Sequence, residues 1–141
     1  MGKSRYEKGL DKLMEFTVKD NKEASTHLKI TENFKDIAPD VSKYMIEFTY
    51  GDIYTRQGLD NKQRALVTIS SLVTLGAEPQ LELHINAGLT AGLTPEEIIE
   101  VFIQLLSYTG FPRVLNAIEV ARKVFTQRGL SVEIPNHDDL V

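Results

Sequence analysis

Apolar residues recur at helical spacing along most of this 141-residue sequence. The spacing i, i+3, i+4, i+7 predicts amphipathic helices over 6–19, 39–50, 60–75, 78–91, 95–109 and 112–128. Strand-type alternation of useful length is absent from the sequence. We therefore predict an all-α fold, a single-domain helical bundle of about six helices. The helical domain is expected to span 1–129, and residues 130–141, which lack helical periodicity, are expected to form an extended or mobile C-terminal tail.

Apolar residues gather on one face of two of these helices. In helix 39–50 they are Val41, Tyr44, Met45 and Phe48, which lie on one side. In helix 112–128 they are expected to point inward and are Leu115, Ile118, Ala121, Val124 and Phe125. Residues 22–37 are mostly polar and are predicted to form a loop with room for one short helical turn. Residues 51–58 are predicted to form a connection that carries Tyr54 and Arg56.

Capping residues mark the ends of the predicted helices. Thr94 and Glu97 form a capping box, in which each side chain accepts a hydrogen bond from the backbone N–H of the other residue. Pro95 takes the first helical position, where the missing N–H costs nothing. Asp60 is expected to cap helix 60–75. Helix ends in left-handed residues are predicted at Gly76, Gly92 and Gly110, and Gly129 is expected to stop the last helix.

Helix 95–109 is more apolar than a solvent-facing helix of a small monomer should be. Its apolar residues are Ile98, Ile99, Val101, Phe102, Ile103, Leu105 and Leu106, which leave one polar stripe of Glu100, Gln104 and Ser107. A surface helix usually has a narrower apolar face. We therefore predict that this helix is buried on most sides, within its subunit and against another copy in a homo-oligomer.

Composition excludes several classes of function. Sixteen basic and twenty acidic residues give a net charge of −4, and no basic cluster indicates a nucleic-acid partner. No apolar run approaches the roughly 18 residues of a membrane-spanning helix, and the charged N-terminus is not a secretory signal. The absence of cysteine excludes disulfides, thiolate metal ligands and thiol catalysis. A cytoplasmic protein is the expected reading.

His84 is the one histidine inside a confidently placed helix of the central segment. Gly88 and Ala91 follow it at i+4 and i+7 and therefore share its face. Such small residues beside a polar ring imply that another backbone packs closely there or that a small cavity remains. His84 is then either a structural histidine satisfied by a neighbouring helix or a residue that lines a site.

An ordered set of residues resembles the carboxymuconolactone decarboxylase family, which also contains the alkylhydroperoxidase D-like proteins. The matching residues are Leu83, His84, Ala87, Gly92, Thr94, Glu97, Ile98, Glu100, Tyr108, Gly110, Pro112, Asn116 and Ala117, preceded by Gly51-Asp52-Ile53-Tyr54, Gly58-Leu59-Asp60 and Arg64-Ala65-Leu66. The resemblance covers roughly 6–125 and implies the alkylhydroperoxidase D-like type of helical bundle. It also implies an assembly of trimers or hexamers.

The resemblance implies the decarboxylase branch of the family rather than the peroxidase branch. The peroxidase branch uses C-x-x-C-x-x-x-H, and alignment of its histidine with His84 places Ala77 and Gln80 at the two cysteine positions. Neither side chain can form a thiolate, so thiol peroxidase activity is excluded. The decarboxylase branch acts on a carboxylated lactone whose conjugated carbonyl receives the electrons released with carbon dioxide, so no cofactor is required. A role in the catabolism of aromatic compounds would follow.

Four residues are the candidates for such a site. In the functional interpretation Arg64 binds the substrate carboxylate, His84 returns a proton to carbon, Glu100 orients His84, and Tyr108 contacts the substrate. The structural alternatives stay open. Arg64 would pair with Asp60 in a solvated first turn, Glu100 would serve an exposed stripe, and Tyr108 would be a core residue. A metal site is not expected, since His84 lacks partners at ligand spacing.

The sequence therefore supports two alternative functions. The first is a cofactor-independent lyase that resembles 4-carboxymuconolactone decarboxylase and acts on a small carboxylated lactone or related acid. The second is a non-catalytic family member that binds a small carboxylate on the same oligomeric scaffold. Convergence of His84, Arg64 and Glu100 on one pocket would favour the first.

Overall fold

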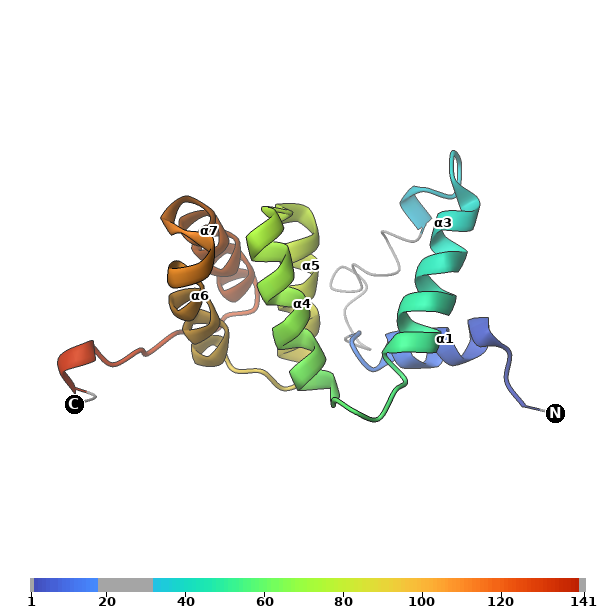
Figure 1. Cartoon of the computed structure of the whole chain (residues 1–141), viewed down its shortest axis with the longest axis horizontal. Coiled ribbons are helices and arrows are strands. Elements are labelled where there is room, and N and C mark those ends of the chain that lie inside the picture. The colour runs from blue at the N-terminus through green and yellow to red at the C-terminus, as the bar shows by residue number, and fades with distance from the viewer. Residues whose placement is uncertain (1, 18–31, 140–141) are drawn as a thin grey trace.

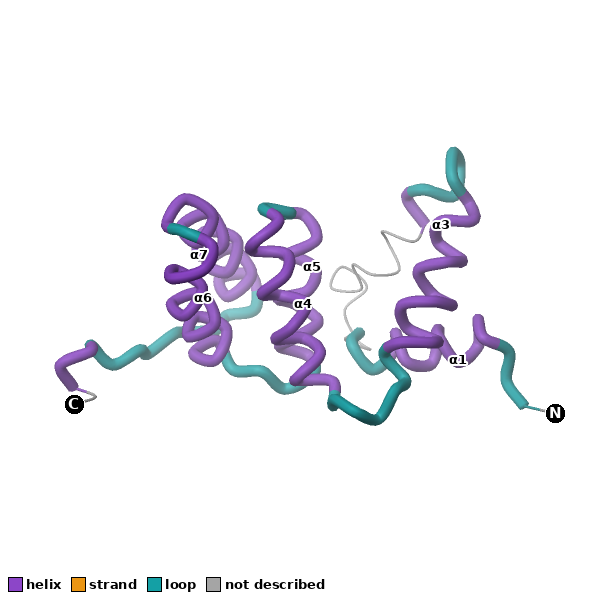
Figure 2. Tube along the Cα trace, in the orientation of Figure 1, coloured by secondary structure: helices purple, strands orange, loops and turns teal. Residues whose placement is uncertain are grey.

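A computed structural model describes residues 2–17 and 32–139 of the chain, and in these ranges every regular element is helical. The elements are α1 (Arg5–Met14), α3 (Pro39–Tyr44), the π-helix η1 (Met45–Ile53), α4 (Asn61–Leu75), α5 (Glu78–Thr90), α6 (Pro95–Thr109), α7 (Phe111–Gln127) and the 3-10 turn η2 (His137–Asp139). Helices α4 to α7 form one group, and beside it α1 crosses η1, which continues α3 (Figures 1 and 2). The all-α prediction is confirmed. The helix predicted over 6–19 ends earlier, at Met14, and residues 15–17 form a turn and a bend. Residues 18 and 19, and most of predicted loop 22–37, lie outside the described residues.

The predicted caps account for the boundaries of α4 and α6. Thr94 Oγ1 accepts from the N–H of Glu97 at 3.1 Å, and Glu97 Oε1 accepts from the N–H of Thr94 at 2.9 Å. Asp60 forms the same reciprocal pair with Gln63 at 2.8 and 2.9 Å. Gly76 ends α4 in the left-handed conformation with φ 70°. These local signals are sufficient to predict the helix boundaries, because each cap binds backbone N–H groups of its own helix turn that have no partner within the helix.

The main core lies among α4, α5, α6 and α7. Its fully buried side chains include Phe102, Ile69, Leu81, Ile85 and Ile98. Helix α7 faces this core with Val114, Ala117, Ala121, Val124 and Phe125. Leu115, which was predicted to point inward, is instead 56% exposed. The prediction erred because Leu115 lies one residue beyond the buried Val114, about 100° around the helix.

A second core joins α1, η1 and α5, and glycine makes it possible. A Cβ atom on Gly9 would overlap the carbonyl oxygen of Ile46, and one on Gly51 would lie 2.8 Å from the carbonyl oxygen of Arg5. The backbones of α1 and η1 are therefore in direct contact where they cross. Leu13 and Phe16 then pack on Ile46.

The π-helix corrects one prediction. Residues Gly51 to Ile53 belong to η1 and not to the connection predicted over 51–58. The apolar face of Val41, Tyr44 and Phe48 points away from the chain's own core, since these residues are 45, 62 and 57% exposed. The buried residues of η1 are Ile46, Tyr50 and Gly51, on the side where α1 packs.

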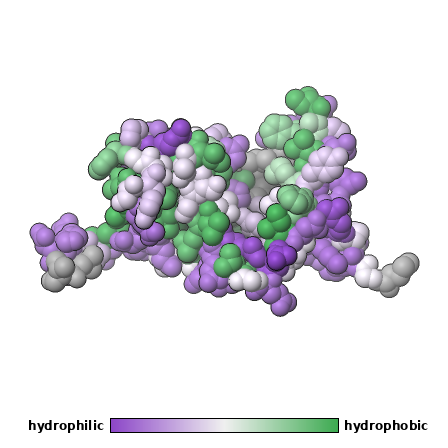
Figure 3. Space-filling model, in the orientation of Figure 1, coloured by the Kyte–Doolittle hydropathy of each residue, from purple (hydrophilic) through white to green (hydrophobic). Residues whose placement is uncertain are grey.

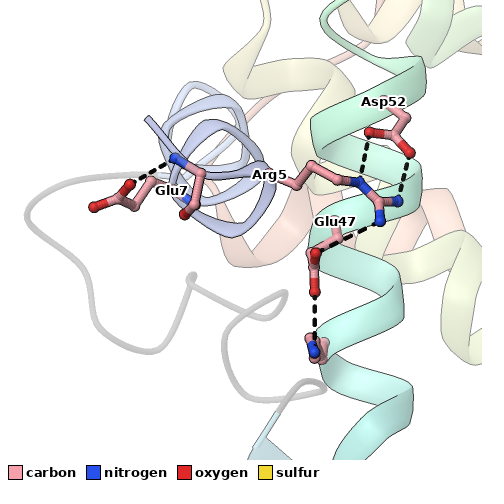
Figure 4. A network of polar contacts seen from close by, with 6 residues as sticks. Arg5, Glu7, Glu47 and Asp52 are labelled. Carbon is pink, nitrogen blue, oxygen red and sulfur yellow. Dashed lines mark hydrogen bonds and ion pairs between the residues drawn. The ribbon is translucent and has the colours of Figure 1, made fainter. Parts of the chain in front are cut away.

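Arg5 fixes the crossing of α1 and η1 through charge. Its Nε and Nη2 donate to the two carboxylate oxygens of Asp52 at 3.1 and 2.6 Å (Figure 4). Glu47 lies 3.7 Å from Arg5 Nη1 and 3.7 Å from Lys43 Nζ. The guanidinium holds the pKa of Asp52 below its usual value. This bidentate geometry sets the crossing angle more than it adds stability, since these groups are exposed.

Apolar side chains remain on two surfaces of the single chain. One surface is the face of Val41, Tyr44 and Phe48 described above. The other, here called the α4/α6/α7 surface, consists of Val67, Leu75, Ile103, Tyr108, Phe111 and Leu115, which are 46 to 80% exposed. Figure 3 shows apolar residues gathered over both groups of helices. Within α6 only Ile98 and Phe102 are fully buried by the chain itself. No helix in the described ranges is long and apolar enough to cross a bilayer.

Candidate functional site

An aromatic cluster lies where α1, η1 and α5 meet. The ring centroids of Tyr50 and Tyr54 are 4.9 Å apart, and the ring of Phe16 packs edge-on to Tyr54 at 5.6 Å. Ala87 and Ala91 of α5 complete this cluster. Burial raises the pKa of both tyrosines, so their phenols stay protonated at neutral pH.

Tyr54 links the cluster to α4. Its hydroxyl lies 2.7 Å from Thr68 Oγ1, in the second turn of α4. The guanidinium carbon of Arg64 lies 6.0 Å from the centre of the Tyr54 ring. Arg64 therefore borders the aromatic cluster from the first turn of α4, within cation–π distance.

Arg64 has an unused donor at this place. Its Nη2 donates to the carbonyl oxygen of Arg56 at 2.8 Å. Its Nε is buried and meets no hydrogen-bond acceptor among the described residues. The predicted alternative, an ion pair with Asp60, does not form within the described residues, and Asp60 Oδ1 accepts from the N–H of Gln63 in the capping box. A buried N–H without an acceptor is costly and favours an incoming acceptor such as a carboxylate.

His84 lies on α5, three residues before Ala87, on the helix face that also carries Ala91. The ring is partly buried. Loss of water lowers its pKa from 6.5 to about 4. His84 is therefore neutral at pH 7.

The small residue beside His84 serves packing. A Cβ atom on Gly88 would lie 2.9 Å from Leu93 Cδ1 and 3.3 Å from Ile69 Cδ1. The space at Gly88 is thus filled by side chains of the main core. Neither of the two predicted explanations, a close backbone or a small cavity, holds at this position.

Glu100 and Tyr108 lie away from this cluster. Glu100 is exposed on α6 and lines a hollow of about 460 Å³ together with Leu66 and Gln104, and His84 is not among the lining residues. Helix α5 packs mainly on α4 and α7. Tyr108 is 80% exposed and is not a core residue of the single chain. The structure thus places Arg64 at the aromatic cluster and His84 on the face of α5 that carries Ala87, and it leaves Glu100 and Tyr108 on the surface of α6.

A polar hollow opens next to Arg64. It has a volume of about 560 Å³ and lies between α1, the connection from Thr55 to Asp60 and the first turn of α4. Lys12, Arg56 and Lys62 contribute cationic side chains to its lining. The described residues contain no group of three metal-ligating side chains. The chemistry within reach is therefore recognition of an anion by guanidinium and ammonium groups.

Two residues of this site escaped the sequence analysis. Thr68 was read only as part of a helix, and Tyr54 only as part of a connection. The signal that could have found Tyr54 was its membership of the motif Gly51-Asp52-Ile53-Tyr54, which had been noted for the family resemblance. The hydrogen bond between Tyr54 and Thr68 depends on the π-helical winding, and no local pattern predicts it.

Comparison with known proteins gives consistent matches. The model of the carboxymuconolactone decarboxylase family matches residues 39–123. A 4-carboxymuconolactone decarboxylase of Acinetobacter baylyi is 33% identical over 134 residues, which cover 95% of this chain and 96% of that protein. An uncharacterized 15.0 kDa protein of Paracoccus denitrificans is 36% identical over 64% of this chain and 69% of its own length. A nitrosuccinic acid decarboxylase of Metarhizium robertsii is 34% identical over 55% of this chain and 54% of its own length.

Proposed function

This chain belongs to the carboxymuconolactone decarboxylase family, and we propose that it is a cofactor-independent decarboxylase of a small carboxylated lactone or related acid. The observation that carries the proposal is the 33% identity over nearly all of a 4-carboxymuconolactone decarboxylase. A second relative bears the name of a decarboxylase that acts on a different acid. These two names support a decarboxylase-type function, and the substrate of this chain belongs to the proposal.

Arg64 is the carboxylate-binding residue of the proposed site. Its unsatisfied Nε and its position beside the Tyr54 ring support this role. A carboxylate there would satisfy the buried N–H and gain a charge-assisted hydrogen bond. As carbon dioxide leaves, the electron pair of the broken carbon–carbon bond moves through the conjugated system of the substrate into its acceptor oxygen. The substrate is thus its own electron sink.

His84 is the proposed proton donor to carbon. The overall reaction exchanges a carboxylate for a hydrogen atom and consumes one proton. Because the free ring has a pKa of about 4, it must acquire that proton as the anionic substrate binds. A nearby negative charge raises the pKa of a histidine, so binding of substrate and uptake of a proton are coupled.

In this proposal neither Glu100 nor Tyr108 takes part in the reaction within a single chain. Both are exposed on α6, so either would contact substrate only where copies of the chain associate. We propose that association in trimers or hexamers, driven by the apolar α4/α6/α7 surface, is the condition under which they take part.

Release of carbon dioxide from a panel of unsaturated carboxylated lactones and β-keto acids tests the proposal. If protonated His84 is required, kcat/KM rises about tenfold for each pH unit that the pH is lowered from 8 to 5, since the free enzyme titrates near 4. His84→Asn should lower the rate about 10² to 10⁴-fold. A folded His84→Asn protein with unchanged turnover would return this histidine to a structural role.

The low pKa of His84 also favours a second function. A neutral imidazole is a very weak acid, so the free protein offers no imidazolium to protonate carbon at pH 7, as expected of a protein that binds a small acid without converting it. Saturable binding of the panel compounds without release of carbon dioxide would identify this non-catalytic function.

A further inference from the structure

After α7 the chain folds back across its last two helices. A left-handed glycine ends α7, and the N–H of Leu130 bonds to the carbonyl oxygen of Phe125 at 2.9 Å. This bond closes a Schellman motif, which turns the chain away from the helix axis. The N–H of Glu133 then donates to Glu96 Oε1 at 3.2 Å, in the first turn of α6 (Figure 1). The segment 130–134 is thus held to α7 at its start and to α6 near its end.

A pocket of about 500 Å³ remains between this segment and the two helices. Leu130, Val132 and Ile134 all line it, as the alternating side chains of an extended backbone allow. Phe125 of α7 also lines it and is only 5% exposed, whereas Leu130 and Val132 remain 39 and 37% exposed. The segment therefore covers the pocket without filling it.

Two polar side chains of α7 interrupt the apolar lining at one place. Arg122 and Thr126 are four residues apart and therefore share a helix face. The Arg122 guanidinium lies 3.3 Å from the carboxylate of Glu119, and these two side chains are 69 and 70% exposed. Such an exposed ion pair contributes little to stability, so the carboxylate of a ligand can compete with Glu119 for the guanidinium.

The pocket has the size and lining of a site for an amphipathic anion. Small-molecule sites have volumes of about 300 to 1,000 Å³, mostly apolar walls and a few polar groups that fix the orientation of the ligand. An apolar body would displace water from the side chains of the segment, and a carboxylate would match the planar fork of Arg122. The hollow beside Arg64 differs, because its lining is mainly polar and charged.

We infer that the pocket beneath residues 130–134 is a binding site for a carboxylic acid with an apolar body, whose carboxylate is held by Arg122. This inference goes beyond the proposed function, since neither Arg64 nor His84 lines the pocket. A ligand there contacts both helices and the segment, so its binding joins the end of the chain to the bundle.

Calorimetric titration of the full-length protein with octanoate, below its micelle concentration, tests the inference. Butyrate keeps the carboxylate and shortens the apolar body, whereas octan-1-ol keeps the body and removes the charge. Octanoate should bind at least about tenfold more tightly than butyrate and about tenfold more tightly than octan-1-ol. Absence of saturable octanoate binding, as expected if a second copy of the chain covers the pocket, would overturn the inference. Equal binding of octanoate and either comparison compound would do the same.

Arg122→Gln tests the anchor of the carboxylate. It should raise the Kd of octanoate about tenfold, through the loss of a charge-assisted hydrogen bond, and leave that of octan-1-ol within twofold. Lys123→Gln is the matched control. Lys123 is the neighbouring exposed cation of α7, is likewise paired with a glutamate, Glu82, at 3.0 Å, and does not line the pocket. Equal effects of the two substitutions on octanoate binding would show that only net charge matters and would overturn the inference.

Val132→Asn tests the contribution of the segment. This residue lies outside the helical core, so the variant should fold as the parent does and raise the Kd of both octanoate and octan-1-ol about tenfold. Ser131→Asn, at the adjacent exposed position that does not line the pocket, should leave both values within twofold. An unchanged Kd in Val132→Asn would place the ligand elsewhere and refute the site. These measurements need no release of carbon dioxide, so the proposed function and this inference fail independently.

Discussion

Acidification should destabilise this protein through His84 at a pH where most carboxylates are still ionised. The folded chain holds His84 neutral, with a pKa of about 4, whereas the unfolded chain binds a proton near pH 6.5. The unfolded state therefore carries more bound protons between these two values. The free energy of unfolding is fully retained above about pH 6.5 and falls as the pH drops toward 4. Below pH 4 the loss caused by His84 remains but no longer changes with pH.

The size of this effect follows from the two pKa values. Between pH 7.5 and pH 5, linkage gives a loss of about 2 kcal/mol from His84 alone. With a urea dependence of roughly 1 to 3 kcal/mol per molar, the midpoint should move by about 1 M. An exposed histidine has the same pKa in the folded and unfolded states, so it contributes nothing to the change in the free energy of unfolding with pH.

Urea unfolding of the parent and of His84→Asn, at pH 7.5 and pH 5, isolates the contribution. Protein concentration is held fixed, because association shifts apparent stability. The carboxyls of Asp52 and Glu7, whose pKa values are lowered, titrate in both proteins and cancel in the difference. His137→Asn, at an exposed position, should behave as the parent does. If the parent and His84→Asn lose equal stability over this range, the burial of a neutral His84 is refuted.

Three further predictions concern packing, assembly and redox chemistry. Gly9→Ala should lower the free energy of unfolding by at least about 2 kcal/mol, because the added methyl group overlaps the Ile46 carbonyl oxygen. The control Gly2→Ala meets nothing within 4 Å and should be neutral. Equal urea midpoints of the two variants would contradict this. The α4/α6/α7 surface should make the protein a stable homo-oligomer, so a monomer in light scattering at micromolar concentration would count against it, and Ile103→Asp should weaken association. A protein without cysteine should reduce no hydroperoxide with thiols, and activity above a heat-killed control in metal-free protein would disprove this.

The sequence predicted those parts of the fold whose causes are local. The boundaries of α4 and α6 were found because Asp60 and Thr94 form capping boxes within one turn of their own helices. The end of α4 was found because Gly76 takes a conformation that suits few other residues. The winding of η1 was missed because its cause lies elsewhere: α1 presses on it at Gly9, more than thirty residues earlier in the chain.

The site was predictable residue by residue and not as an arrangement. Arg64 and His84 could be nominated from residue type and family resemblance, and the structure finds Arg64 beside the Tyr54 ring and His84 on the face of α5 that carries Ala87. The neutral state of His84 follows from the burial of its ring, which the sequence does not show. The proposed pairing of Glu100 with His84 assumed that neighbouring helices in sequence are neighbours in space, whereas α5 packs mainly on α4 and α7.

The length of the π-helix η1 determines the direction in which the Tyr54 side chain points. The N–H of Tyr54 bonds to the carbonyl oxygen of Thr49 at 2.9 Å, five residues back, so each turn of η1 holds one residue more than an α-turn. Rewinding the same residues as an α-helix would rotate each successive side chain further about the axis and carry the Tyr54 hydroxyl away from Thr68. The number of residues in η1 thus sets the angle about the helix axis at which Tyr54 points toward the site. Adding or removing one residue there would re-aim a phenol while leaving every residue that touches it unchanged.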